Sequence, residues 1–115
     1  MGPPQLEALA AKALECASTG DIPPLFAQAA GGNLVYVAAS KGALDGSAIL
    51  VKQDSPIKTL ADLKGKKLAF KRGSSAHNFA LGALRSVGLS LGDVEAIDLG
   101  PPDAAPAFAN GQIDA

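Results

Sequence analysis

The sequence predicts an α/β fold made of two half-lobes, each with a mostly parallel sheet flanked by helices. Helix-forming segments alternate along the chain with short, nearly continuous apolar runs. Such runs are typical of parallel strands, which are buried on both faces. The pattern pauses around residues 53–57 and then restarts. We therefore assign residues 1–54 to part of a first lobe and residues 55–115 to the first half of a second lobe.

In the first half of the chain, prolines and glycines mark the ends of the predicted elements. Pro3 and Pro4 open a helix over residues 5–13, because proline fits the first helical turn. A short strand over 14–18 leads into a second helix over 22–30, whose prolines also lie in its first turn. Two further strands are expected over 33–40 and 47–52, joined by a glycine-containing turn.

The second half repeats the alternation of strand and helix. Thr59 and Asp62 fit a capping box that starts a short helix ended by Gly65. A strand over 66–71 precedes the longest helix, 75–87, and a strand over 94–100 follows it. Asp103 is expected to cap the last helix, and a final strand begins at 112.

Composition excludes several classes of function. The 115 residues carry a net charge of −1 and only 4% aromatic side chains, so neither charge nor stacking favours nucleic acid as a partner. Cys16 is the only cysteine, which excludes an internal disulfide. His77 is the only histidine, so we expect no metal site. No apolar run reaches the length of a membrane span, and we expect a soluble chain.

Two polar junctions stand out, each at the carboxyl end of a predicted strand and the amino end of a helix. The first N–H groups of a helix have no intrahelical acceptor and carry partial positive charge, so they stabilise an anionic oxygen. Glycine lets a ligand approach these amides, and hydroxyl groups add donors. The candidate ligand-binding residues are Ser18, Thr19, Gly20 and Asp21 at the first junction, and Gly73, Ser74, Ser75 and the nearby His77 at the second.

Each junction also has a purely structural interpretation, because Ser, Thr, Asp and Gly commonly cap helices. For Asp21, capping its own helix is the favoured role; its carboxylate would otherwise meet an ammonium group, and it would repel a bare anion. Residues 73–77 do not match the Gly-x-Ser-x-Gly pattern of serine hydrolases. The phosphate-binding glycine motifs of nucleotide sites are also missing. The basic residues of 64–72 fit a solvated sheet edge, with local steering of an anion as the alternative.

Four stretches of the sequence resemble the periplasmic aliphatic-sulfonate-binding proteins, solute receptors of ABC importers that are related to taurine and nitrate receptors. The stretches are "STGDIPPLFAQAAG", "LVYVAAS", "AILVKQDSPIKTLADLKGKKLAFKRGSSAHNFALGALRSVGLS" and "PPDAAPAFANGQIDA". The pair "STGDIPP" and "GSSAH" is the more specific signal. The resemblance implies a type II periplasmic-binding-protein-like fold that is truncated at both ends in this chain.

The resemblance also implies a function. A sulfonate or similar small oxyanion would bind in a cleft between the lobes without catalysis, cofactor or metal. An ABC permease in the membrane would be the protein partner, and the parent protein would be periplasmic. Two alternatives stay open: an enzyme on the same fold, like the pyrimidine-synthase relatives of this family, or an effector-sensing domain of a transcription regulator.

Overall fold

The computed structural model describes residues 2–42 and 46–115, which form two compact units. The N-terminal unit contains the described residues up to Gly46 together with Gly73–Ser75. The C-terminal unit contains Ser47–Arg72 and Ala76–Ala115. The division into lobes 1–54 and 55–115 was made for a two-lobed receptor. It is a different division from these compact units, and it stays a prediction.

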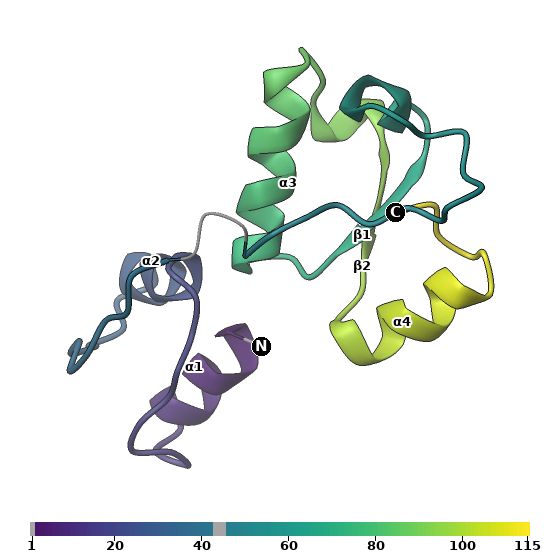
Figure 1. The fold of residues 1–115 in the computed structure, drawn as a ribbon. Coiled ribbons are helices and arrows are strands. Elements are labelled where there is room, and N and C mark those ends of the chain that lie inside the picture. The colour runs from purple at the N-terminus through teal and green to yellow at the C-terminus, as the bar shows by residue number, and fades with distance from the viewer. Residues whose placement is uncertain (1, 43–45) are drawn as a thin grey trace. The chain divides into compact units, whose positions relative to one another are not determined.

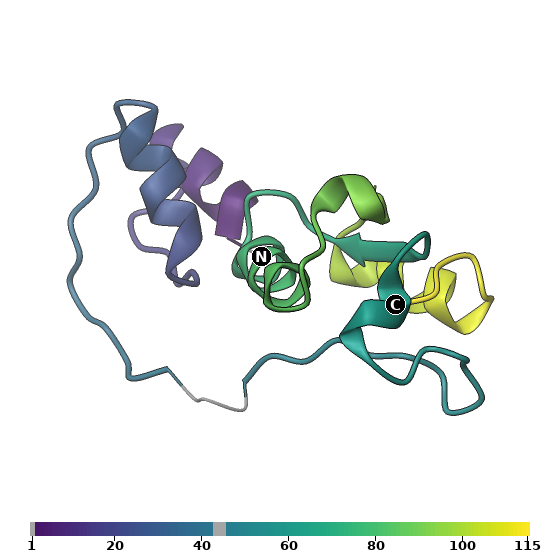
Figure 2. The same ribbon diagram turned by 90° about the horizontal axis from the view of Figure 1, so that it is seen from above.

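The N-terminal unit is built on two helices, α1 (Gly2–Ala10) and α2 (Ile22–Ala29). They lie side by side in both views (Figures 1 and 2). The predicted helix over 5–13 is confirmed as an element, but it begins and ends three residues earlier because Pro3 and Pro4 lie inside its first turn. The helix predicted over 22–30 is also confirmed, and its Pro23 and Pro24 are buried.

The strands predicted over 14–18, 33–40 and 47–52 are wrong, since the described residues of these segments form no strand. Figure 2 shows the segment after α2 as an extended trace with no neighbouring strand. A strand exists only where a neighbouring backbone completes its hydrogen bonds, and none is present here. Val35 and Val37 are therefore 83% and 84% exposed. Residues 43–45, within the predicted turn, lie outside the described residues.

The C-terminal unit contains a parallel pair of strands, β1 (Lys67–Phe70) and β2 (Glu95–Asp98). Leu68 pairs with Ala96 and Phe70 with Asp98. These strands confirm the predictions over 66–71 and 94–100 and support the predicted parallel sheet. On the other edge of β1, the Ala69 N–H donates to the Ala115 carbonyl at 2.9 Å. The end of the predicted strand from 112 thus lies beside β1 without forming a regular strand.

The helices of this unit follow local signals. The short 3₁₀ helix η1 (Leu60–Leu63) begins with the predicted capping box, in which the Thr59 N–H donates to Asp62 Oδ2 at 2.8 Å. Helix α3 (Ser75–Ser86) confirms the prediction over 75–87, and a second 3₁₀ turn, η2 (Leu91–Asp93), was not predicted.

Helix α4 (Pro101–Ala109) begins earlier than predicted, and its N-cap is Gly100 instead of Asp103. The Gly100 carbonyl accepts hydrogen bonds from the N–H groups of Asp103 and Ala104. Pro101 and Pro102 occupy the first helical positions, where their fixed φ favours the helix, so the start moves upstream of Asp103.

The apolar core of the C-terminal unit fixes α3 against β1. Leu84 of α3 is completely buried, Leu63 of η1 is 1% exposed, and Phe70 of β1 is 6% exposed. Figure 1 shows α3 and α4 beside the strand pair. Because interiors are packed at crystal-like density, this core holds α3 from Ala76 onward at a defined position beside β1.

We expect Leu84→Ala to lower the free energy of unfolding by about 3 kcal/mol, since it removes a buried side chain and leaves a cavity. Leu25→Ala is the matched control, because Leu25 is also helical but 56% exposed, and it should cost less than about 0.5 kcal/mol. Urea unfolding measures both. Equal costs would show that α3 is not held by this core.

Candidate functional site

The first junction offers fewer backbone donors than the sequence analysis assumed. Helix α2 begins with Ile22, Pro23 and Pro24, and proline has no N–H. Among the first three residues of α2, only Ile22 therefore carries an amide donor. The sequence analysis treated the start of this helix as a full set of N–H donors, and the two prolines in the sequence already exclude that.

The second junction retains its donors. Gly73 turns the chain after β1 with φ 71°, a left-handed conformation that a residue with a Cβ adopts only with strain. Helix α3 then begins with Ser75, Ala76 and His77, all of which carry an N–H group. Ser74 precedes the helix and is only 7% exposed. The amino end of α3 thus has more backbone N–H groups among its first three residues than the amino end of α2.

The two junctions meet within the N-terminal unit. Ser75 Oγ donates a hydrogen bond to Asp21 Oδ1 at 2.9 Å, although 54 positions separate the two residues in the sequence. Gly20 lies against the same side chain, and a Cβ at position 20 would overlap Ser75 Oγ. Glycine at position 20 therefore leaves room for the Ser75 hydroxyl group.

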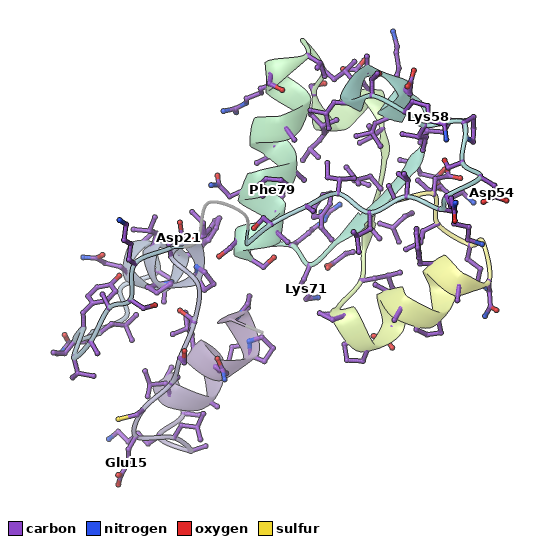
Figure 3. All side chains as sticks on the ribbon, viewed as in Figure 1. Glu15, Asp21, Asp54, Lys58, Lys71 and Phe79 are labelled. Carbon is purple, nitrogen blue, oxygen red and sulfur yellow. The ribbon has the colours of Figure 1, made fainter. Side chains whose placement is uncertain are left out.

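Asp21 does not cap its own helix, which corrects the favoured interpretation of this residue. Its side chain makes no capping hydrogen bond, and its backbone is helical with φ −68° and ψ −32°. A capping carboxylate accepts from the N–H of the second or third helical residue, and here both are proline. The carboxylate at the start of α2 (Figure 3) is bonded to Ser75 instead.

The remaining predicted ligand residues differ in their exposure and in their contacts. Ser18 and Gly20 are exposed, and Thr19 Oγ1 donates to the Gly20 carbonyl at 2.8 Å. His77 belongs to the C-terminal unit, where its ring stacks on Phe70 with centroids 5.0 Å apart. The N-terminal unit therefore contains the predicted residues of both junctions except His77.

A charged pair, not predicted from the sequence, lies at the carboxyl ends of the two strands. Lys71 Nζ is 3.1 Å from Asp98 Oδ1, and the Arg72 N–H donates to the same oxygen at 3.1 Å. These hydrogen bonds, first the Arg72 amide and then Lys71, lower the pKa of Asp98. Lys71 is therefore paired at the sheet edge. The pair could have been predicted from the sequence, because Lys71 and Asp98 each lie at the end of one of two adjacent parallel strands.

An apolar cavity of about 420 Å³ lies in the C-terminal unit, between α3, α4 and β1. Its walls include Phe79, Phe108 and several alanines, and none of the predicted ligand residues lines it. Walls of this kind offer no donors to an oxyanion, so the cavity does not match the predicted ligand chemistry.

Two kinds of feature are absent from residues 2–42 and 46–115. No three His, Cys, Asp or Glu side chains gather there as metal ligands. No helix in those ranges is both long and apolar enough to cross a bilayer.

The fold matches solved solute-binding proteins. The alkanesulfonate-binding protein SsuA from Xanthomonas axonopodis pv. citri, solved bound to MOPS, shares 49% identity with a TM-score of 0.93 over 98% of this chain. The periplasmic aliphatic sulphonate binding protein SsuA from Escherichia coli shares 52% identity with a TM-score of 0.84. These similarities confirm the type II periplasmic-binding-protein-like fold predicted from the sequence.

Residues 4–115 match the sequence pattern of the protein family described as NMT1/THI5 like. The chain belongs to the NMT1/THI5-like family. A relative from Escherichia coli (strain K12), provisionally named an aliphatic sulfonates-binding protein, is 53% identical over 114 residues. The chain spans 36% of the length of that relative and 37% and 39% of the two solved SsuA chains.

The Asp98 contacts predict a dependence of stability on pH. Because the folded-state pKa lies below the unfolded value of 3.8, the ionised carboxylate stabilises the fold above that value. This contribution is lost as the pH falls through the folded pKa.

Urea unfolding between pH 7 and pH 2.5 measures the free energy of unfolding of the unsubstituted chain and of Asp98→Asn. The difference between the two should shrink below about pH 3.8. Asp54→Asn removes an equal charge at an exposed loop position and serves as control. A difference that does not change with pH would contradict the assignment.

The contact between the junctions predicts coupling between positions 20 and 75. Gly20→Ala should lower the free energy of unfolding by about 1–2 kcal/mol, because the new methyl group displaces Ser75 Oγ from Asp21. In a Ser75→Ala background the same substitution should cost less, although the Ser75 Cβ still lies 3.2 Å from the added methyl position. A double-mutant cycle measures the coupling. Additive costs would show that the junctions do not touch.

Proposed function

We propose that this chain forms part of the solute receptor of an ABC importer and binds an aliphatic sulfonate or a similar small oxyanion without catalysis. The observation that carries the proposal is the amino end of α3, which follows a glycine turn and begins with three N–H donors. The names of the two solved SsuA proteins support the ligand class. MOPS, bound in one of them, is itself a sulfonate.

The chemistry of a sulfonate suits backbone amides. The group carries one negative charge spread over three oxygens, all of which accept hydrogen bonds and none of which donates. A helix amino terminus offers N–H donors and about half a positive charge without a counter-ion that would have to be desolvated. Hydrogen bonds to a charged acceptor are roughly twice as strong as neutral ones, so a few amides suffice for binding.

Within this proposal the second junction provides most of the donors. The amides of Ser75, Ala76 and His77 would hold the sulfonate oxygens, with Gly73 and Ser74 shaping the turn that leads to them. Ser18, Thr19 and Gly20 would contribute from the first junction. Closure around a buried ligand is the general device of two-lobed receptors, and the permease would recognise the closed state. The receptor would work in the periplasm, since the solved SsuA from Escherichia coli is named a periplasmic binding protein.

An enzyme of the same family is the second candidate. It is favoured by a Haemophilus influenzae relative named as a thiamine biosynthesis protein, although that relative matches only 60% of this chain at 35% identity. Such chemistry would depend on His77, which stacks on Phe70. Binding of a sulfonate that returns unchanged after prolonged incubation favours the receptor, and its conversion favours the enzyme.

We expect Ser75→Pro to weaken binding of ethanesulfonate about tenfold more than Ser75→Ala does. Both substitutions remove the hydroxyl group, but only proline removes the amide at the first helical position, where proline is well tolerated. Calorimetric titration should use a chimera in which this chain replaces the matched third of the Escherichia coli relative, so that a complete receptor is measured. Equal affinities of the two variants would remove the Ser75 amide from the site.

A further inference from the structure

We propose that residues 33–40 form an interaction surface for a second copy of this chain, with which they pair backbone to backbone as an antiparallel sheet between copies. The inference goes beyond the proposed function and does not depend on the ligand. It starts from an extended apolar segment that has no backbone partner within the described residues.

The segment follows α2, lies in the N-terminal unit and is extended (Figure 2). No hydrogen bond joins residues 33–40 to any other residue in the ranges 2–42 and 46–115. The segment contains no proline, so every one of its residues carries an N–H donor and a carbonyl acceptor. An extended backbone with open donors and acceptors is a template on which another strand can pair.

The side chains of the segment are those of a strand. Val35 and Val37 are β-branched and Tyr36 is aromatic, the residue types that sheets favour. Tyr36 is 67% exposed, and both valines are exposed still further. In an extended backbone successive side chains point to opposite faces, so the valines share one face and Leu34 and Tyr36 share the other. Both faces are therefore apolar, and pairing with another strand would remove part of each from water.

A second copy is the partner that matches the segment, because it offers the same donors, acceptors and apolar faces. Residues 33–40 carry no charged side chain and the whole chain has a net charge of only −1, so electrostatic repulsion between copies is small. The nearest charged residue in the sequence is Lys41. An antiparallel pair keeps the two Lys41 side chains at opposite ends, whereas a parallel pair would place like charges side by side. Charge therefore favours antiparallel pairing of two copies about a twofold axis.

The length of the segment is sufficient for a regular strand pair. At about 3.3 Å per residue it extends over roughly 26 Å, which is longer than a typical strand. Two strands alone are only marginally stable in water, and such a pair still has two open outer edges. Further copies can add at these edges in the same way, so we expect species larger than a dimer at high protein concentration.

Tyr36 is a reporter inside the segment, because it is the only tyrosine and the chain has no tryptophan. Sedimentation velocity measures the size of the 115-residue chain as its concentration rises, and iodide quenching of tyrosine fluorescence measures the exposure of Tyr36 in the same samples. We expect association together with protection of Tyr36 from iodide. A chain that stays monomeric, or that associates while Tyr36 stays equally accessible, would overturn the inference. Both measurements use the unsubstituted chain, so they decide the question even if a variant does not fold.

Val35→Lys tests the role of the segment itself. The substitution places a charge on a side chain that is already exposed, and lysine is a residue that natural edge strands use against pairing. We expect the dissociation constant for self-association to rise by about tenfold or more. Leu25→Lys is the matched control, because it makes the same change of charge at an exposed helical residue of the same unit, and it should leave self-association unchanged.

Equal weakening by both lysine variants would assign the association to apolar surface in general and overturn the role of residues 33–40. The measurements contain no ligand, so their failure leaves the proposed receptor function in place. Failure of the chimera to bind a sulfonate would, in turn, leave the pairing of the segment in place.

Discussion

The proposed function of this chain depends on the backbone amides at the amino end of α3. Their position follows from the core, because Leu84 and Ala80 of the helix are buried together with Leu68 and Phe70 of β1. Gly73 then reverses the chain between strand and helix. A rigid core thus places a set of donors that needs no cationic side chain, which suits reversible binding of a weakly basic anion.

The two junctions look alike in sequence but differ in physical character. Helix α3 begins with residues that all carry N–H groups, whereas α2 begins with two prolines after Ile22. The first junction therefore contributes shape and charge more than backbone donors: Gly20 gives room for Ser75, and Asp21 bonds to it.

Local signals in the sequence were sufficient for the elements that local interactions determine. The capping box at Thr59, the helix from Ser75 and the strands around Leu68 and Ala96 were all predicted. The strand expected around Val35 was not formed, because strand formation depends on a neighbouring backbone that no local pattern reveals. The chain spans about a third of the length of its Escherichia coli relative.

The candidate site was predicted as a set of residues but not as a set of contacts. Ser75 and Asp21 were both named from the sequence, yet their hydrogen bond joins positions 54 apart and could not be read from spacing. The failure of Asp21 to cap α2, in contrast, could have been predicted from Pro23 and Pro24, since they remove the amides that a capping carboxylate requires.

The most direct measurement of the central claim is an NMR titration of the ¹⁵N-labelled chimera with ethanesulfonate, following each backbone amide. We expect the largest, saturable shifts on the N–H signals of Ser75, Ala76 and His77. Saturable shifts that fall instead on residues of the apolar cavity, such as Phe79 and Phe108, with the start of α3 unchanged, would contradict it.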